Sequence, residues 1–446
     1  MSSLFMFSVI FLSVVAMILA ISKLKQHPFI VMVIIAIIVG LVCGMEPEEV
    51  IKTVKSGFGN ILGNIGIVIL CGTIIGTILE KTGAALTMAN TILGIVGKER
   101  SVLTMGIVGY ITGIPVFCDS GFVILSPISR ALAAQSNKSL AVIATALSGG
   151  LYATHCLVPP TPGPIAIAGN LGADLGLVIM VGLVISIPAV AFAIFYANKI
   201  ASTIDIPANP QFTVEELLEK YGKLPGPIHS FSPIILPIIL IALKSVGDFK
   251  THPLGEGALQ HFVSFIGNPV IALIIGVFLA MTLIPVHDKD IDLEWVTEGV
   301  QNSAAILVIT AAGGSFGAIL GKLPIAAALQ GSLLNLGLGI LIPFLISTIL
   351  KLSMGASTVA MIVTSQMVAP LLGTLGFDST MGKVLVTMAI GAGSMTASHA
   401  NDSYFWVVSQ FSDMKPSEAY KCQTGMPGAM GLVCLVVIYI ASLILL

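Results

Sequence analysis

Ionisable side chains interrupt this apolar sequence at a few positions where a membrane helix would have to break. Asp119 lies in the motif C-D-S-G, His155 precedes a run of prolines, and His399 and Asp402 lie together in the segment 398–406. An ionisable group at membrane depth costs several kcal/mol unless it is paired or lines a cavity. We therefore take these residues as candidates for contacting a polar solute or carrying a proton.

Prolines predict the first of these breaks. The segment 154–164, T-H-C-L-V-P-P-T-P-G-P, has four prolines in six positions, so a helix must end near His155 and cannot resume before about Ile165. Unwound backbone at membrane depth is tolerated only where it is buried in protein or lines a water-filled cavity. We expect His155 and Thr161 to meet solute hydroxyl groups there, and a tight external loop is the alternative interpretation.

The second break is polar rather than proline-rich. The segment 398–406, S-H-A-N-D-S-Y-F-W, interrupts an apolar stretch with donors for a carboxylate or hydroxyls from His399, Asn401 and Ser403. Asp402 adds a carboxylate that can take up a proton once burial shifts its titration. A structural hydrogen-bond network between helices is the alternative interpretation of this segment.

Two Gly–Ser tips suggest anion sites. The motifs C-D-S-G at 118–121 and G-A-S-T at 355–358 each precede an apolar helix, whose free amides and dipole favour an anion. Asp119 would repel a carboxylate unless protonated, which makes it our first candidate for the coupling proton. Ordinary N-capping is the alternative interpretation. The predicted ligands at these tips are Ser120, Gly121, Ser357 and Thr358.

Composition places the chain in a membrane. Of its 446 residues, 56% are hydrophobic and only 9% are charged, whereas soluble domains carry about 25% charged residues. The length allows about ten to fourteen crossings of roughly 20 residues each. The 20 basic and 22 acidic residues form no polybasic run, which argues against nucleic acid. Scattered cysteines without a C-x-x-C motif indicate no metal site.

An internal repeat divides the chain at a polar linker, residues 199–230. Residues 72–86 match residues 313–327 at an offset of 241, and residues 149–155 match residues 393–399 at an offset of 244. The predicted fold is therefore all-α and polytopic, with a first repeat over residues 1–198 and a second over residues 231–446. Abundant glycine and alanine could also produce such matches by chance.

Each repeat is predicted to hold about five crossings plus a re-entrant hairpin, and an odd number of crossings inverts the second repeat in the membrane. The two arginines of the chain, Arg100 and Arg130, flank the first hairpin and suggest that both its ends face the cytoplasm. Two minimal crossings are the alternative interpretation of this segment. Broken helices at the midplane complete each repeat. The predicted segments are hairpins at about 101–135 and 331–376 and broken helices at 139–170 and 383–411.

The sequence lacks the motifs of two other classes of membrane protein. The chain has no G-x-x-x-x-G-K-[ST] motif for an ATP-driven pump and no H-E-x-x-H motif for a metalloprotease. A passive anion channel stays open as an alternative, because re-entrant hairpins also build pores.

Four motifs resemble the gluconate permease family: G-I-P-V-F-C-D-S-G-F-V-I-L-S-P-I at 113–128, H-C-L-V-P-P-T-P-G-P at 155–164, N-L-G-A-D-L-G at 170–176 and S-H-A-N-D-S-Y-F-W at 398–406. The resemblance covers essentially the whole chain. It implies a multi-pass proton symporter for sugar acids in the bacterial inner membrane, within a superfamily of inverted repeats with paired hairpins. It also implies a homodimer in which each subunit has a scaffold part and a moving transport part.

Two departures from the family pattern leave the substrate open. Asp119 stands where members tend to have glutamate, followed by Ser120 rather than an apolar residue, and Thr161 stands where a second histidine is common. Relatives in the family carry D-serine, hydroxybutyrate and short hydroxy acids, so an acid smaller than gluconate is the alternative.

We predict a secondary active transporter, not an enzyme, that imports a sugar acid such as gluconate with a proton. Its partners would be a small anionic solute and membrane lipids, and it would need no cofactor or metal. Asp119 or Asp402 would carry the proton, and sodium stays open as the coupling ion.

Overall fold

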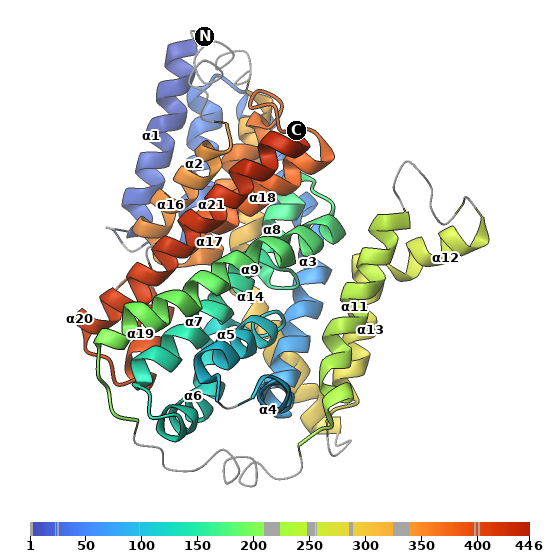
Figure 1. The fold of residues 1–446 in the computed structure, drawn as a ribbon. Helices are drawn as coiled ribbons and strands as arrows, with labels where there is room; N and C mark the ends of the chain where they lie inside the picture. The colour runs from blue at the N-terminus through green and yellow to red at the C-terminus, as the bar shows by residue number, and fades with distance from the viewer. Residues whose placement is uncertain are drawn as a thin grey trace.

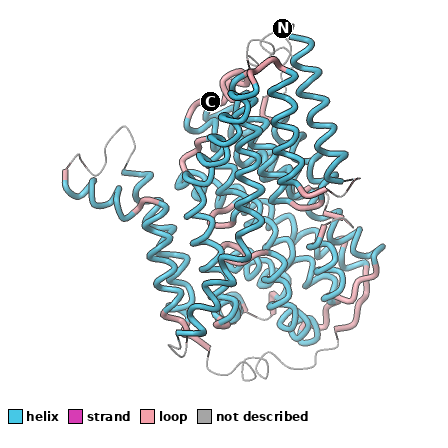
Figure 2. Tube along the Cα trace, turned by 180° about the vertical axis from the view of Figure 1, so that it is seen from behind, coloured by secondary structure: helices cyan, strands magenta, loops and turns pink. Residues whose placement is uncertain are grey.

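A computed structural model describes most of the chain, and every described element is a helix or a loop (Figures 1 and 2). The part of the chain that the structure describes contains no strand, which confirms the predicted all-α class. Asn401 and the first part of the predicted second hairpin lie outside the described residues. These residues are 3–22, 24, 26–97, 99–208, 224–247, 255, 257–284, 289–323, 339–396, 398–399 and 402–446.

The first half of the chain forms nine helices among its described residues. Several begin at a proline, which suits the first helical position because the amide there has no partner within the helix. These helices are α1 (Ser3–Ser22), α2 (Pro28–Val42), α3 (Pro47–Lys81), α4 (Ala84–Val96), α5 (Ser101–Thr112), α6 (Cys118–Gln135), α7 (Leu140–Leu157), α8 (Pro162–Leu171) and α9 (Leu175–Lys199), followed by the 3-10 turn η1 (Ala201–Thr203).

The second half begins with α11 and α13, which lie side by side at one edge of the molecule (Figure 1). The elements are α11 (Pro227–Gly247), α12 (Ala258–Ile266), α13 (Pro269–Met281), α14 (Lys289–Lys322), α16 (Leu341–Met354), α17 (Ser357–Val368), η3 (Ala369–Leu371), α18 (Thr380–Met395), α19 (Ser403–Phe411), α20 (Pro416–Ala419), η4 (Tyr420–Thr424) and α21 (Gly425–Leu445).

The helices fit a multi-pass membrane protein. Among the described residues, five helices are long and apolar enough to cross a membrane, or up to seven when two bent pairs each count as one crossing. The predicted ten crossings exceed this count, because α2, α4, α5, α16 and α17 are apolar but shorter than a membrane-spanning helix. The helix α4 was not predicted as a separate element.

The helices α3 and α14, which contain the repeat matched at an offset of 241, pack together and run antiparallel. Near one end of the contact a Cβ atom on Gly57 would lie 2.4 Å from the Gly314 carbonyl oxygen, so only glycine permits this approach. Near the other end the Lys81 Nζ and Glu298 Oε2 atoms are 2.8 Å apart. An antiparallel pair of related helices is what inverted repeats would produce.

The four segments predicted as hairpins or broken helices each contain two helices. A turn over residues 113–117 joins α5 to α6, and residues 355–356 join α16 to α17. Residues 158–161 separate α7 from α8, and residues 396–402 separate α18 from α19. The first break is shorter than predicted, because α8 resumes at Pro162 rather than near Ile165, and proline is well tolerated at the first helical position. The halves exchange contacts, because α6 packs against α19 and α17 packs against α8.

Arg130 links the end of α6 to the loop after α19. Its Nη1 atom donates a hydrogen bond to Asp413 Oδ2 at 2.6 Å, and its Nη2 atom donates to the Phe411 carbonyl oxygen at 2.8 Å. The guanidinium lowers the pKa of the Asp413 carboxyl below its ordinary value. This exposed contact therefore holds α6 against α19 at neutral pH and weakens in acid.

Replacing Asp413 by asparagine is expected to lower thermal stability at pH 7 but not at pH 3. Because the pKa is depressed in the folded state, the contribution is present above the unfolded value of about 4 and is lost as pH falls through the folded value. Solvent screening limits the effect to about 0.2–1 kcal/mol. Asparagine tolerates the left-handed backbone here, φ 54°. An equal difference in melting temperature at both pH values would contradict the assignment.

Candidate functional site

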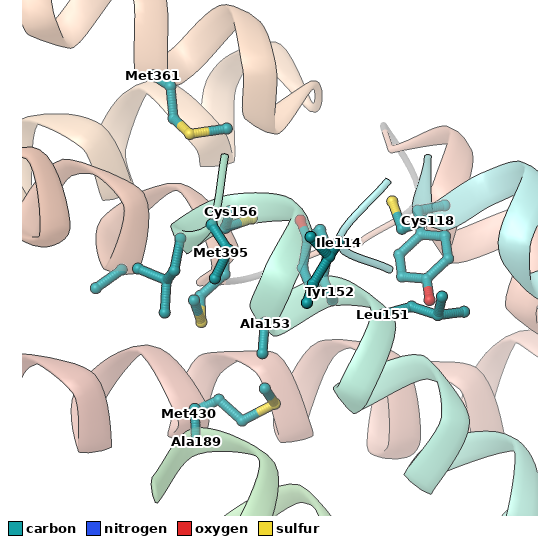
Figure 3. Packing of buried hydrophobic residues seen from close by; sticks show 14 of the residues in the cluster. Ile114, Cys118, Leu151, Tyr152, Ala153, Cys156, Ala189, Met361, Met395 and Met430 are labelled. Carbon is teal, nitrogen blue, oxygen red and sulfur yellow. The ribbon is translucent and has the colours of Figure 1, made fainter. Parts of the chain in front are cut away.

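Helix ends from both halves of the chain meet around α7. At the start of α6, Asp119 Oδ1 accepts a hydrogen bond of 3.2 Å from Ser403 Oγ at the start of α19. Near the end of α7, the hydroxyls of Tyr152 and Ser357 share a hydrogen bond of 2.6 Å. Figure 3 shows buried side chains packed around α7, with Cys118 on one side and Met395 on the other. The two halves therefore build one polar cluster.

Lys351 and Asp402 form a buried ion pair within this cluster. The Lys351 side chain is 0% exposed, and its Nζ atom lies 2.6 Å from Asp402 Oδ2. Lys351 also donates a hydrogen bond to the Gly355 carbonyl oxygen in the turn before α17, and Nζ lies 5.7 Å from the centre of the Tyr152 ring. The pair therefore joins the α16–α17 turn to the break between α18 and α19.

Asp402 also fixes the start of α19. Its Oδ1 atom accepts a hydrogen bond of 3.2 Å from the Tyr404 amide, which makes it the N-cap, and its Oδ2 atom accepts one of 2.6 Å from Ser398 Oγ. Aspartate is a favoured N-cap because its side chain pairs an amide that has no partner within the helix. Both oxygens of this predicted proton carrier are thus engaged.

Asp119 has a different environment from Asp402. Besides Ser403, it accepts a hydrogen bond of 3.6 Å from Cys118 Sγ, and the described residues give it no cationic partner. The neighbouring Ser120 hydroxyl interacts with the Glu80 side chain on α3. The proton-carrying candidate therefore lies where α3, α6 and α19 meet, held by neutral donors only.

His155 lies two residues before the end of α7, in a buried position. Its ring stacks on Tyr152, with ring centres 6.3 Å apart and planes at 12°. Its Nδ1 atom is buried without a hydrogen-bond partner, which is unusual for a polar atom. Thr161, predicted beside it as a solute ligand, donates its hydroxyl to the carbonyl oxygens of Val158 at 2.7 Å and His155 at 3.1 Å. The Thr161 hydroxyl is therefore hydrogen-bonded to the backbone within the break, whereas His155 Nδ1 remains available to a ligand.

The first turns of α6 and α17 contain amides that have no partner within their helix. The Gly121 amide donates to the Phe117 carbonyl oxygen at 2.8 Å, so it is already paired within the first turn. The amides before it, at 118–120, have no helical partner, and the same holds for the first amides of α17. Thr358 lies in the first turn of α17 against α8, since its Cα atom is 3.9 Å from a Cβ built on Gly163.

The polar break before α19 is described only in part. His399 lies beside the end of α16, where its Nε2 atom donates a hydrogen bond of 3.1 Å to the Leu352 carbonyl oxygen. Asn401 lies outside the described residues. The described residues contain no cluster of three or more His, Cys, Asp or Glu side chains that could hold a metal ion.

A hollow of about 260 Å³ lies at the far ends of α8 and α17, where they face α3 and α14. It is lined by amide side chains, including Asn60, Asn170 and Gln366, and by glycines. Since a helix rises 1.5 Å per residue, Asn170 lies about 12 Å along α8 from the break. The polar side chains that line this hollow therefore lie near the C-terminal end of α8, away from the break.

The family model for GntP family permeases matches residues 5–444 of the chain. The chain belongs to the GntP permease family. This confirms the resemblance seen in the motifs and identifies a permease rather than an enzyme.

Three curated relatives show the range of names within the family. An uncharacterized permease of Haemophilus influenzae is 36% identical over 90% of this chain and 84% of its own length. The gluconate permease of Pseudomonas aeruginosa is 32% identical over 97% of this chain and 96% of its own. The D-serine transporter DsdX of Escherichia coli is 31% identical over 100% of both chains.

The fold of the permease is also found in a solved transporter. The YdaH transporter of Alcanivorax borkumensis aligns with a TM-score of 0.66, at 15% sequence identity, over 93% of this chain and 98% of its own. At that identity the likeness concerns the fold alone. It agrees with the all-helical fold of the described residues.

Lys351 is the residue of the permease site that the motifs did not reveal. It opens the motif K-L-S-M-G-A-S-T, from which only the G-A-S-T tip was taken as a site. Its signal was nevertheless present, because a lysine within the apolar helix α16 is costly at membrane depth unless it is paired. Its partner Asp402 was among the predicted residues, but nothing in the sequence relates the two.

Proposed function

We propose that this permease is a secondary active transporter that imports a sugar acid such as gluconate together with a proton across the bacterial inner membrane. The observation that carries this proposal is one buried cation, Lys351, which contacts the turn just before the start of α17. Lysine and free helix amides both favour an anion. A small carboxylate is the solute that such a set of donors would select.

Hydroxyl groups of the acid would contact the remaining polar side chains. His155 offers its unpaired Nδ1 atom, Ser357 and Ser403 offer hydroxyls at the starts of α17 and α19, and the Tyr152 hydroxyl lies beside that of Ser357. We keep Thr161, His399 and the other predicted ligands in the site as proposals. The relative named gluconate permease supports a polyhydroxy acid as the first candidate.

Two carboxyls could exchange the coupling proton. Asp119 is held by neutral donors, so a proton can neutralise it without breaking an ion pair. Asp402 is paired with Lys351, so a proton there must be accompanied by a new partner for the lysine. Either route couples proton binding to the cluster in which the acid would bind.

Alternating access would come from motion of the hairpin-bearing helices against α3 and α14. Gly72 and Gly76 of α3 lie against the break and the hairpin turn, since a Cβ on them would be 2.9 Å from the Pro160 carbonyl oxygen and 2.7 Å from that of Pro115. A surface of glycines allows close sliding contact. The antiparallel packing of α3 and α14 supports the inverted repeats that such transporters use.

A smaller hydroxy acid or D-serine is the second candidate, favoured by the relative named D-serine transporter. Either solute carries the carboxylate that the cluster would bind. A passive anion channel is the alternative of another class.

Uptake of labelled gluconate into proteoliposomes is expected to require an inward proton gradient, because the acid and the proton would bind the same cluster. The measurement is initial uptake with and without a proton ionophore, repeated for D-glycerate and D-serine. Uptake that the ionophore leaves unchanged would contradict proton coupling. Failure of unlabelled acid inside the vesicles to drive counterflow of labelled acid would favour a channel.

A further inference from the structure

We propose that Lys351 is the residue that binds the carboxylate of the transported acid, and that the acid takes the place of Asp402 on the lysine while Asp402 accepts the coupling proton. This inference rests on the proposed function in one respect, namely that the solute is a carboxylate. It goes further by assigning Lys351 to the carboxylate of the acid and by choosing Asp402, rather than Asp119, as the carrier of the coupling proton.

Burial of the cation is the first argument. Lys351 is 0% exposed, and a buried ammonium is tolerated only with a counter-charge. Among the described residues, Asp402 is the carboxylate paired with it. An acid that entered the cluster without meeting Lys351 would add a negative charge beside Asp119 and Asp402, with one cation for all three.

The position of the ammonium is the second argument. Lys351 Nζ contacts the Gly355 carbonyl oxygen, two residues before the first residue of α17. A carboxylate that binds Nζ would therefore lie close to the free amides at the start of α17. It would also lie near the Tyr152 ring and the hydroxyl of Ser357, which is hydrogen-bonded to Tyr152. Lysine and helix amides would thus hold the same group.

Asp402 can give up the lysine without losing its structural role. Its Oδ1 atom would still cap α19 through the Tyr404 amide, and only Oδ2 would change partner. A proton bound at Oδ2 can be donated to Ser398 Oγ, which now donates to that oxygen at 2.6 Å. The serine hydroxyl simply exchanges its role from donor to acceptor.

Charge balance explains why the proton would accompany the acid. Before the exchange the ammonium faces one carboxylate, that of Asp402. After it, the ammonium faces the carboxylate of the acid, and Asp402 is neutral because it has bound one proton from solution. The net charge of the group is unchanged, so one proton enters the cluster with each acid.

Other titratable groups surround the pair and must be considered in any pH experiment. They come from α6, α7 and α19, and they are close enough to Asp402 or Lys351 to interact electrostatically. These groups are Cys118, Asp119, Tyr152, His155, Cys156 and Tyr404.

Two variants distinguish a solute-binding role of Lys351 from a purely structural ion pair, because we expect them to have opposite effects on affinity for the acid. Asp402→Asn leaves the lysine without a competing carboxylate, so the acid should bind at least as tightly as in the wild type, and with little dependence on pH. The double variant Lys351→Gln/Asp402→Asn removes both charges without leaving one unpaired. It should remain folded and lose at least about 30-fold in affinity, or about 2 kcal/mol.

Isothermal titration of the full-length permease in nanodiscs, with gluconate, D-glycerate and D-serine, measures these affinities. Lys322→Gln is the matched control, because that lysine is exposed near Glu49 at the end of α14 and should leave affinity unchanged. The assignment is overturned if the double variant binds the acid within threefold of the wild type, or if Asp402→Asn loses affinity as the double variant does.

Proton uptake during the same titration tests the second half of the proposal. Titration in buffers of different ionisation enthalpy should give close to one proton per acid for the wild type and none for Asp402→Asn. If Asp402→Asn still takes up a proton and Asp119→Asn does not, the proton belongs to Asp119 and the exchange at Asp402 is wrong. If the wild type binds none of the three acids, the proposed function fails together with this assignment.

Discussion

A Lys351→Met variant is expected to lose about 3–5 kcal/mol in free energy of unfolding. The substitution keeps the length of the side chain but leaves Asp402 as a buried carboxylate without its cation, and breaking a buried ion pair on one side costs about that much. The substitution should also weaken the contact between the α16–α17 turn and the start of α19, because the ion pair joins them.

Thermal unfolding of purified protein in detergent measures this effect as a fall in melting temperature of about 5–10 °C. The double variant Lys351→Met/Asp402→Asn should recover at least half of the loss, because the asparagine can still cap α19 while carrying no charge. Lys322→Met is the matched control at an exposed lysine. A double variant as unstable as the sum of its single variants would show that the two side chains are not energetically coupled.

A Gly150→Ala substitution is expected to be nearly as damaging, although it adds a single methyl group. A Cβ atom on Gly150 of α7 would lie 2.3 Å from the Gly106 carbonyl oxygen and 2.6 Å from the Tyr110 amide nitrogen of α5. Both are backbone atoms, so the helices themselves must move apart. Forcing extra volume into packed structure costs about 1–3 kcal/mol, and here we expect the upper end of that range.

Gly94→Ala is the matched control for this prediction. Gly94 also lies within a helix, α4, but a Cβ atom there would meet nothing within 4 Å. Alanine should therefore leave stability unchanged or raise it by up to about 1 kcal/mol through its higher helix propensity. Equal melting temperatures for the two alanine variants would show that α5 and α7 are not in backbone contact at Gly150.

The sequence alone determined the class of protein and the local breaks of its helices. Apolar composition is a property of the whole chain, and it predicted a polytopic membrane protein. The prolines after His155 predicted an interruption that the structure has between α7 and α8. Glycine, proline and charge act on the backbone next to them, so their effects can be predicted without knowing what packs against them.

Only the tertiary structure decided which of these breaks come together. Lys351 and Asp402 are 51 residues apart, Tyr152 and Ser357 are 205 apart, and Asp119 and Ser403 are 284 apart. The paired amide of Gly121 and the backbone hydrogen bonds of Thr161 were equally invisible in the motifs. Such contacts depend on how rigid helices pack, and many arrangements of the same apolar helices satisfy the same local signals. A lysine within an apolar helix signals that it needs a partner, but only packing selects that partner.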